Sequence, residues 1–203
     1  MTPGEAIVAG TDLILASTSP YRRQLLARLG LPFRTVAPDV DEPAIQALFD
    51  AASAVELAEH LALAKAASVA RREANATVIG SDQVCVCQDR LLGKPGTVAA
   101  AREQLQFLAG KEHRLITAVA VACGGGLVQH TDVTRLQMRT LTADEIERYV
   151  AADQPLDCAG SYKLESLGIA LFERIDSADQ TAITGLPLLG LCRLLRQAGF
   201  VLP

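Results

Sequence analysis

Three consecutive glycines, Gly124–Gly126, constrain the fold more than any other feature of this sequence. They separate two long segments rich in apolar residues, which run from Arg114 to Cys123 and from Leu127 to Arg139. Because glycine adopts positive φ without steric cost, the triplet predicts a tight turn between two antiparallel strands. The chain is therefore expected to contain a long hairpin.

Helices and shorter strands are predicted on both sides of this hairpin. Apolar runs predict strands at residues 12–16, 33–37, 77–80 and 168–175, and a continuation of the third strand at 84–87 after an interruption. Capping residues predict helices after Ser19, after Ser53 with Glu56, after Thr97, after Thr142 with Glu145, and a last helix at 188–197. Helices that alternate with strands, together with one long hairpin, indicate an α/β fold with a mixed sheet.

Length and charge limit the organisation of the chain and its partners. Its 203 residues, half of them hydrophobic, fit one domain that spans residues 1–203. A net charge of −4 gives no basic field for nucleic acid or anionic lipid, so we expect a small ligand held by local cations. Neither a secretory signal nor an apolar run near the roughly 20 residues of a membrane span is recognisable, which predicts a cytoplasmic protein without membrane contact.

A segment rich in hydroxyls and arginine, Ser17–Arg23, joins the first predicted strand to the first helix. Backbone N–H groups and the positive end of the helix dipole meet at such a junction, so it favours anions. Arg22 and Arg23 each cost roughly 0.3 to 1 kcal/mol in a first helical turn, which a bound phosphate chain would offset. The alternative is a pair of solvated arginines on an exposed face.

Three acidic residues, Asp39, Asp41 and Glu42, follow the second predicted strand. Carboxylates beside a triphosphate repel it unless a divalent cation lies between them, so this cluster predicts Mg²⁺ or Mn²⁺ as a cofactor. Taken alone, the cluster is better explained by an exposed turn.

Three further charged residues fall at informative positions. Lys65 continues the inward helical row of Leu57 and Leu61, from which its ammonium could either snorkel to solvent or reach a phosphate. Asp82 lies where a buried strand ends, a position typical of a general base or a metal ligand. Lys94 adds a cation in a turn rich in glycine and proline.

Six ordered motifs resemble the Maf family of nucleotide pyrophosphatases, and together they extend from about Leu13 to Gln197. The motifs are Leu13–Arg23, Val40–Glu42, Ile79–Gln83, Gly93–Pro95, Ala159–Ser161 and Gly185–Leu188. The resemblance implies a two-lobed, Maf- and ITPase-like fold with a nucleotide cleft between the lobes. It also implies a divalent metal and hydrolysis of a nucleoside triphosphate to a monophosphate and pyrophosphate. A homodimer is suggested by the resemblance alone.

The resemblance also implies roles for individual residues. Phosphate binding is assigned by position to Ser17, Arg22, Arg23, Lys65 and Lys94. Glu42 and Asp82 match the residues that serve the metal and the attacking water, and Asp82 matches the general base. Catalysis would then depend on charge neutralisation and positioning, without a covalent nucleophile.

Three positions bear on the choice of nucleobase. Members similar to dTTP and UTP pyrophosphatases usually carry arginine, threonine and glutamine where this chain has Tyr21, Gln83 and Glu165. The three residues present here resemble the subgroup similar to 7-methyl-GTP pyrophosphatases. Since 7-methylguanine is cationic, an aromatic face at Tyr21 and a carboxylate at Glu165 suit it. Ser166 departs from the glycine that the subgroup often has after this glutamate.

Two alternatives to 7-methyl-GTP hydrolysis stay open from the sequence. One is a pyrophosphatase of standard nucleotides such as dTTP, UTP or CTP. The other is a nucleotide-binding regulator of septum formation that does not depend on turnover. The presence of both a candidate base and a candidate metal carboxylate favours a catalyst, because a binding protein needs neither.

Overall fold

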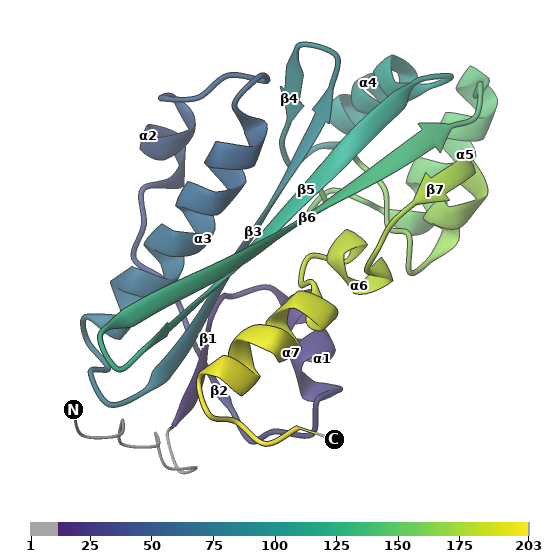
Figure 1. Ribbon diagram of the computed structural model, residues 1–203. Coiled ribbons are helices and arrows are strands. Elements are labelled where there is room, and N and C mark those ends of the chain that lie inside the picture. Colours follow the sequence, from purple (N-terminus) through teal and green to yellow (C-terminus); the bar gives the residue numbers. More distant parts are fainter. Residues whose placement is uncertain (1–11, 203) are drawn as a thin grey trace.

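The computed structural model describes residues 12–202, which form a mixed sheet with helices on both of its faces (Figure 1). The strands follow the order β2 (Arg34–Val36), β1 (Leu13–Ala16), β3 (Thr77–Cys87), β5 (Glu112–Cys123), β6 (Gly126–Met138) and β7 (Phe172–Asp176), and β4 (Arg90–Leu92) also pairs with β3. Strand β1 is parallel to β2 and β3, and the other pairs are antiparallel. The predicted α/β class with a mixed sheet is therefore confirmed.

The predicted hairpin is the longest pairing in the sheet. Strands β5 and β6 pair from Glu112 opposite Gln137 to Cys123 opposite Gly126. Gly124 and Gly125 form the turn with φ of 57° and 77°, values that side chains rarely tolerate.

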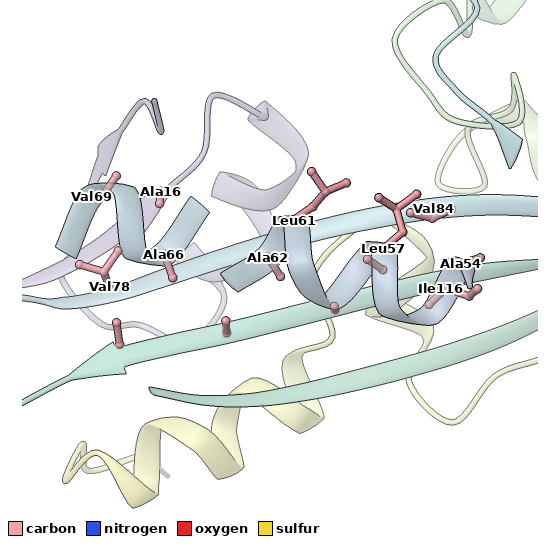
Figure 2. Packing of buried hydrophobic residues seen from close by; sticks show 14 of the residues in the cluster. Ala16, Ala54, Leu57, Leu61, Ala62, Ala66, Val69, Val78, Val84 and Ile116 are labelled. Carbon is pink, nitrogen blue, oxygen red and sulfur yellow. The ribbon is translucent and has the colours of Figure 1, made fainter. Parts of the chain in front are cut away.

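Helix α3 (Ala54–Ala70) covers one face of the long strands (Figure 2). Its inner side carries several alanines, which let the helix approach the sheet closely. The closest approach is at Gly80, where an added Cβ would lie 2.3 Å from the carbonyl oxygen of Ala62 and 2.5 Å from the nitrogen of Ala66. Gly80 therefore sets the distance between α3 and β3.

Two buried clusters occupy the opposite face of the sheet. At one end, α1 (Pro20–Ala27) and α7 (Leu188–Gln197) pack on β1, β3 and β5. At the other end, α4 (Val98–Leu108) and α5 (Ala143–Asp153) pack on β3, β5 and β6. The short helix α6 (Gln180–Ile183) packs against β5 and β6.

Strand β3 has an open stretch on the edge that faces β1 and β4. On that edge β1 pairs with residues 77–80 and β4 with residues 85–87, whereas β5 pairs on the other side from Val78 to Val86. Within residues 12–202, positions 81–84 thus have no strand partner on this edge. Consecutive side chains point to opposite faces of a strand. At an unpaired edge, side chains from both faces can therefore border the same space beside the strand.

Several local predictions hold and others are wrong. Ser19 and Thr97 cap their helices, and Thr142 with Glu145 forms the predicted capping box. Ser53 makes no cap, because its hydroxyl donates to Asp50 instead, at 2.7 Å.

Two predicted strands have different bounds in the structure. The interruption predicted within residues 77–87 is wrong, since β5 pairs along the whole stretch and keeps β3 continuous. The strand predicted at 168–175 begins instead as a 3₁₀ helix, η1 (Leu167–Leu171), and β7 follows it. Helix α2 (Glu42–Gln46) and helix α6 were not predicted.

Candidate active site

A cavity of about 790 Å³ opens at the unpaired stretch of β3. It is lined by the junction between β1 and α1, by α2, α3 and β3, by the turn after β4, and by segments near residues 157–165 and 183–185. The predicted site residues that line it are Ser17, Tyr21, Arg22, Glu42, Lys65, Asp82, Gln83, Lys94 and Glu165. Arg23 is the exception, because it is exposed and does not line the cavity.

Lys65 lies between two carboxylates at one end of the cavity. Its Nζ is 2.6 Å from Oδ1 of Asp82 and 2.9 Å from Oε1 of Glu42. The side chains of Lys65 and Asp82 are only 6% and 10% exposed, whereas Glu42 is 49% exposed on the first residue of α2. The inward orientation of Lys65 is therefore confirmed, and its buried ammonium offsets one of the two negative charges.

Helix α2 places Glu42 within reach of Lys65. Asp41 caps this helix by accepting a hydrogen bond from the nitrogen of Ala44 at 3.0 Å, and Pro43 lies in its first turn. These residues are a helix-start signal, so the acidic cluster is partly a capping device and not only an exposed turn.

Arg22 is held in the cavity by a backbone carbonyl. Its Nε donates to the oxygen of Gly185 at 2.8 Å, and the hydroxyl of Ser81 donates to the same oxygen at 3.0 Å. Burial lowers the pKa of Arg22, while the nearby charges of Asp82 and Glu42 raise it. Since arginine remains charged in proteins, the guanidinium keeps donors for an anion.

Ser17 and Lys94 complete the polar lining at this end. Ser17 is buried, and its hydroxyl oxygen accepts a hydrogen bond from the nitrogen of Ser19 at 3.1 Å, which stabilises the turn before α1. Lys94 is exposed and follows β4. Basic groups from α1, α3 and this turn thus reach one cavity, as the charge pattern predicted.

The wall of the cavity near Tyr21 has a different character. Tyr21, Asp157, Cys158 and Glu165 all line this part. Burial raises the pKa of Tyr21, and the neighbouring Cys158 and Asp157 add to the effect. Burial also raises the pKa of Cys158 to about 12, with contributions from Asp157 and Glu165, so this thiol stays protonated at neutral pH.

Gln83 and Thr117 form a contact on the face of the sheet opposite Lys65. The Gln83 amide nitrogen lies 3.0 Å from the hydroxyl oxygen of Thr117 and also contacts carbonyl oxygens of α6. Thr117 and Asp157 carry no signal in the sequence that marks them as site residues. Gly185 is marked only by the motif that contains it.

The carboxylates suit a divalent cation only as a pair. Among residues 12–202, no group of three or more histidine, cysteine or acidic side chains could hold a metal ion. Glu42 and Asp82 converge on the ammonium of Lys65, which places both carboxylates at one end of the cavity. Oxygen ligands of this kind fit Mg²⁺ or Mn²⁺ when phosphate and water complete the shell.

The chain matches a known protein family. The family model described as Maf-like protein matches residues 12–198. The chain belongs to the Maf-like family. Its site motifs therefore lie in a Maf-like domain that covers almost the whole described chain.

Several relatives of this Maf-like chain share one name. A protein of Xanthomonas axonopodis pv. citri named 7-methyl-GTP pyrophosphatase is 53% identical over 191 residues, which cover 94% of this chain and 98% of that protein. Proteins with the same name from Polaromonas sp. and Bdellovibrio bacteriovorus are 50% and 48% identical. These alignments cover 94% and 92% of this chain, and 86% and 97% of those proteins.

Within the described residues, no helix is both long enough and apolar enough to span a membrane.

Proposed function

We propose that the protein hydrolyses 7-methyl-GTP to 7-methyl-GMP and pyrophosphate. The observation that carries this proposal is the Lys65 ammonium held between Asp82 and Glu42, in a cavity that Arg22 and Lys94 also line. Such a concentration of cations beside two acids suits a polyphosphate and the charge that develops on its oxygens. The names of the relatives support the same reaction.

Each residue at this end has a task in the proposed reaction. Arg22 offers a planar guanidinium for phosphate oxygens, and Lys65 and Lys94 contribute point charges. Asp82 binds Lys65 through Oδ1, and its Oδ2 accepts no hydrogen bond from residues 12–202. That oxygen is available to take the proton of an attacking water, which makes Asp82 the general base.

The proposed reaction includes a divalent cation, Mg²⁺ or Mn²⁺. Glu42 and Asp82 would hold it, and when bound it would neutralise charge on the phosphate oxygens. Lys65 holds the carboxylates of Glu42 and Asp82 near each other, so the protein brings this acidic pair together before a metal binds.

The opposite wall supports the choice of base. A 7-methylguanine ring carries a positive charge, and the aromatic face of Tyr21 and the carboxylate of Glu165 both attract it. We further propose that the enzyme acts in the cytoplasm, where it removes modified nucleotides as a house-cleaning enzyme. We also propose that it forms a homodimer.

Pyrophosphate release from 7-methyl-GTP and from GTP, with and without Mg²⁺, tests the proposal. We expect kcat/KM to be at least about tenfold higher for 7-methyl-GTP, because a charge-assisted contact contributes about 1.5–3 kcal/mol. Activity should disappear when the metal is chelated. Equal rates for the two substrates would contradict the base assignment, and faster hydrolysis of dTTP, UTP or CTP would favour standard nucleotides.

A regulator of septum formation is distinguished by the Asp82→Asn variant. If hydrolysis is the cellular role, this variant loses its cellular effect together with turnover. A variant that binds nucleotide and keeps the cellular effect without turnover would favour the regulatory role.

A further inference from the structure

Gln104 of α4 joins two turns that border the cavity at different ends. Its Nε2 donates to the carbonyl oxygen of Gly93 at 3.1 Å, and its Oε1 accepts from the hydroxyl of Ser161 at 2.6 Å. A carbonyl oxygen only accepts hydrogen bonds, so the NH₂ group must face Gly93 and the amide oxygen is left for Ser161. One side chain therefore uses both of its polar atoms between the two turns.

Each of these contacts lies beside a residue of the proposed site. Gly93 and the following Lys94 both line the cavity. Ser161 lies four positions before Glu165, which lines the cavity at the other end. Gln104 itself does not line the cavity, so its influence on the reaction must pass through these two turns.

The backbone at Ser161 turns sharply to make its contact. Its φ is 63°, in the left-handed region that residues with a side chain rarely adopt, and its side chain is fully buried. The preceding Gly160 also has a positive φ, of 79°, and an added Cβ there would lie 2.9 Å from the ring of Tyr162 and 3.1 Å from Sγ of Cys85. A tightly packed bend thus buries the Ser161 hydroxyl, and Gln104 supplies the acceptor that a buried hydroxyl needs.

A backbone hydrogen bond joins the same two turns. The nitrogen of Gly96 donates to the carbonyl oxygen of Leu156 at 3.0 Å. Helix α4 follows this turn directly and carries Gln104. The turn that contains Lys94 is therefore held at both of its ends, at Gly93 by the amide and at Gly96 by the segment that leads to Ser161.

We infer that Gln104 is a positioning residue, which holds the turn of Lys94 and the segment of Glu165 in one arrangement. This inference deepens the proposed function and rests on it for the tasks of Lys94 and Glu165. Both residues are exposed and lie outside helices and strands, so no regular element fixes them. A displacement of about 1 Å at a reacting group can lower a rate about 100-fold, so a link between the two turns matters for the reaction.

Two double-mutant cycles test the positioning role. The kcat/KM for 7-methyl-GTP is measured with and without Gln104→Leu in the wild type, in Lys94→Ala and in Glu165→Gln. Gln104→Leu should lower it about tenfold in the wild type, but no more than about threefold in either other background, because one of its two tasks is already lost. Tenfold losses in all three backgrounds would show that Gln104 only stabilises the fold. Coupling to only one partner would overturn the claim that it serves both turns.

Ser161→Ala tests the contact at the Glu165 end by itself. This variant removes the hydroxyl and leaves the contact of Gln104 with Gly93 in place. The ratio of kcat/KM for 7-methyl-GTP to that for GTP should fall about threefold, while kcat/KM for GTP should stay within about twofold of the wild type. Equal losses with both nucleotides would show that the hydroxyl does not position Glu165.

Hydrogen exchange measures the link between the turns without any substrate. Gln104→Leu should speed the exchange of backbone amides at least about fivefold in both residues 93–96 and residues 156–161. Gln106→Leu is the matched control, because Gln106 is exposed on the same helix and outside the cavity lining, and it should exchange like the wild type. Faster exchange confined to α4, or none at all, would overturn the inference.

The outcome can be separated from a failure of the proposed function. If the wild type prefers UTP over 7-methyl-GTP, the proposed substrate is wrong, and both cycles are measured with UTP. If the wild type releases pyrophosphate from none of these nucleotides, the cycles are measured through the dissociation constant of the triphosphate. Coupling of Gln104 to Lys94 and Glu165 would then still support the positioning role, and equal losses in all backgrounds would overturn it.

Discussion

The two ends of the cavity differ in how the protein holds their side chains. Near Lys65, the polar groups extend from α3, β3 and α2 and bind one another at 2.6 and 2.9 Å. Near Glu165, the lining comes partly from residues 154–166, which form turns between α5 and η1, and Glu165 itself is exposed. Regular elements thus preorganise the end proposed for phosphate chemistry, whereas turns shape the end proposed for the base.

This difference leads to a simple expectation about variants. Changes at the Lys65 end should affect every nucleotide alike, because all triphosphates share the same tail. Changes at the Glu165 end should alter the ratio between nucleotides, because only the base differs there.

The largest effect is expected for Asp82→Asn. Loss of the general base should lower kcat about 10³-fold for every triphosphate, since proton transfer contributes roughly 10²–10⁴-fold. Pyrophosphate release measures the loss, and nucleotide binding serves as the control for folding. Retention of more than about a tenth of wild-type activity would rule out Asp82 as the base.

Gly80→Ala tests how closely α3, which carries Lys65, must approach β3, which carries Asp82. An added Cβ meets backbone atoms of α3 at 2.3 and 2.5 Å, so the helix must move away from β3. Overpacking costs about 1–3 kcal/mol or more, and the same shift should separate Lys65 from Asp82 and lower activity on all nucleotides. Denaturant unfolding measures the stability.

Gly93→Ala is the matched control, because an added Cβ at this position would meet nothing within 4 Å. It should unfold like the wild type. Equal stability of the Gly80→Ala and Gly93→Ala variants would show that α3 can adapt to the extra methyl group.

Neighbouring arginines provide the next contrast. Arg22→Ala should lower kcat/KM about 100-fold on all triphosphates, because a charged donor to phosphate is lost. Arg23→Ala should change it less than about threefold, because Arg23 is exposed and outside the cavity lining. Similar losses for the two variants, measured by pyrophosphate release, would contradict this assignment.

At the other end, Glu165→Gln combined with Tyr21→Arg should change preference rather than total activity. The ratio of kcat/KM for 7-methyl-GTP to that for dTTP should fall at least about tenfold, since the cationic base loses both attractive groups. Glu173→Gln, which removes an exposed carboxylate outside the cavity lining, is the control and should leave the ratio unchanged. An unchanged ratio in the double variant would show that Tyr21 and Glu165 do not determine the preference for the base.

The last prediction concerns the effect of low pH on stability, and it involves a buried histidine that contacts the cavity residue Tyr162. His113 is buried beside Tyr162, a cavity residue whose hydroxyl lies 2.9 Å from its Nε2. Burial lowers the pKa of His113 from 6.5 to about 4, so the unfolded state binds the proton more readily. Stability should therefore fall as pH drops from 6.5 towards 4, by at most about 1.4 kcal/mol per pH unit.

His113→Gln, which does not titrate, isolates this contribution. Denaturant unfolding of both proteins at pH 7 and pH 5 measures it. The wild type should lose more stability than the variant over this interval, and parallel losses would contradict the role of His113.

The sequence predicted most of the fold because local signals agreed with tertiary packing. The glycine triplet and the caps at Ser19, Thr97 and Thr142 specify their elements within a few residues. The wrong predictions arose where pairing with a segment distant in the sequence determines the local structure. Polar residues within β3 suggested an interruption, but pairing with β5 keeps the strand continuous.

The candidate site was predictable to a similar extent. Charged residues such as Lys65 and Asp82 could be identified from their positions, because a charge on a buried face needs a partner. Thr117 and the carbonyl groups of α6 could not, since they act only through contacts that join segments 34 or more residues apart. Arg22 and Arg23 also look alike in sequence, and only the packing near Gly185 distinguishes them.

A crystal structure of the Asp82→Asn variant with 7-methyl-GTP and Mg²⁺ tests the central claim most directly. We predict that the triphosphate lies against Arg22 and Lys94, with the metal at Glu42. The base should lie between Tyr21 and Glu165. A triphosphate bound outside this cavity, or a base located at the Lys65 end, would contradict the account.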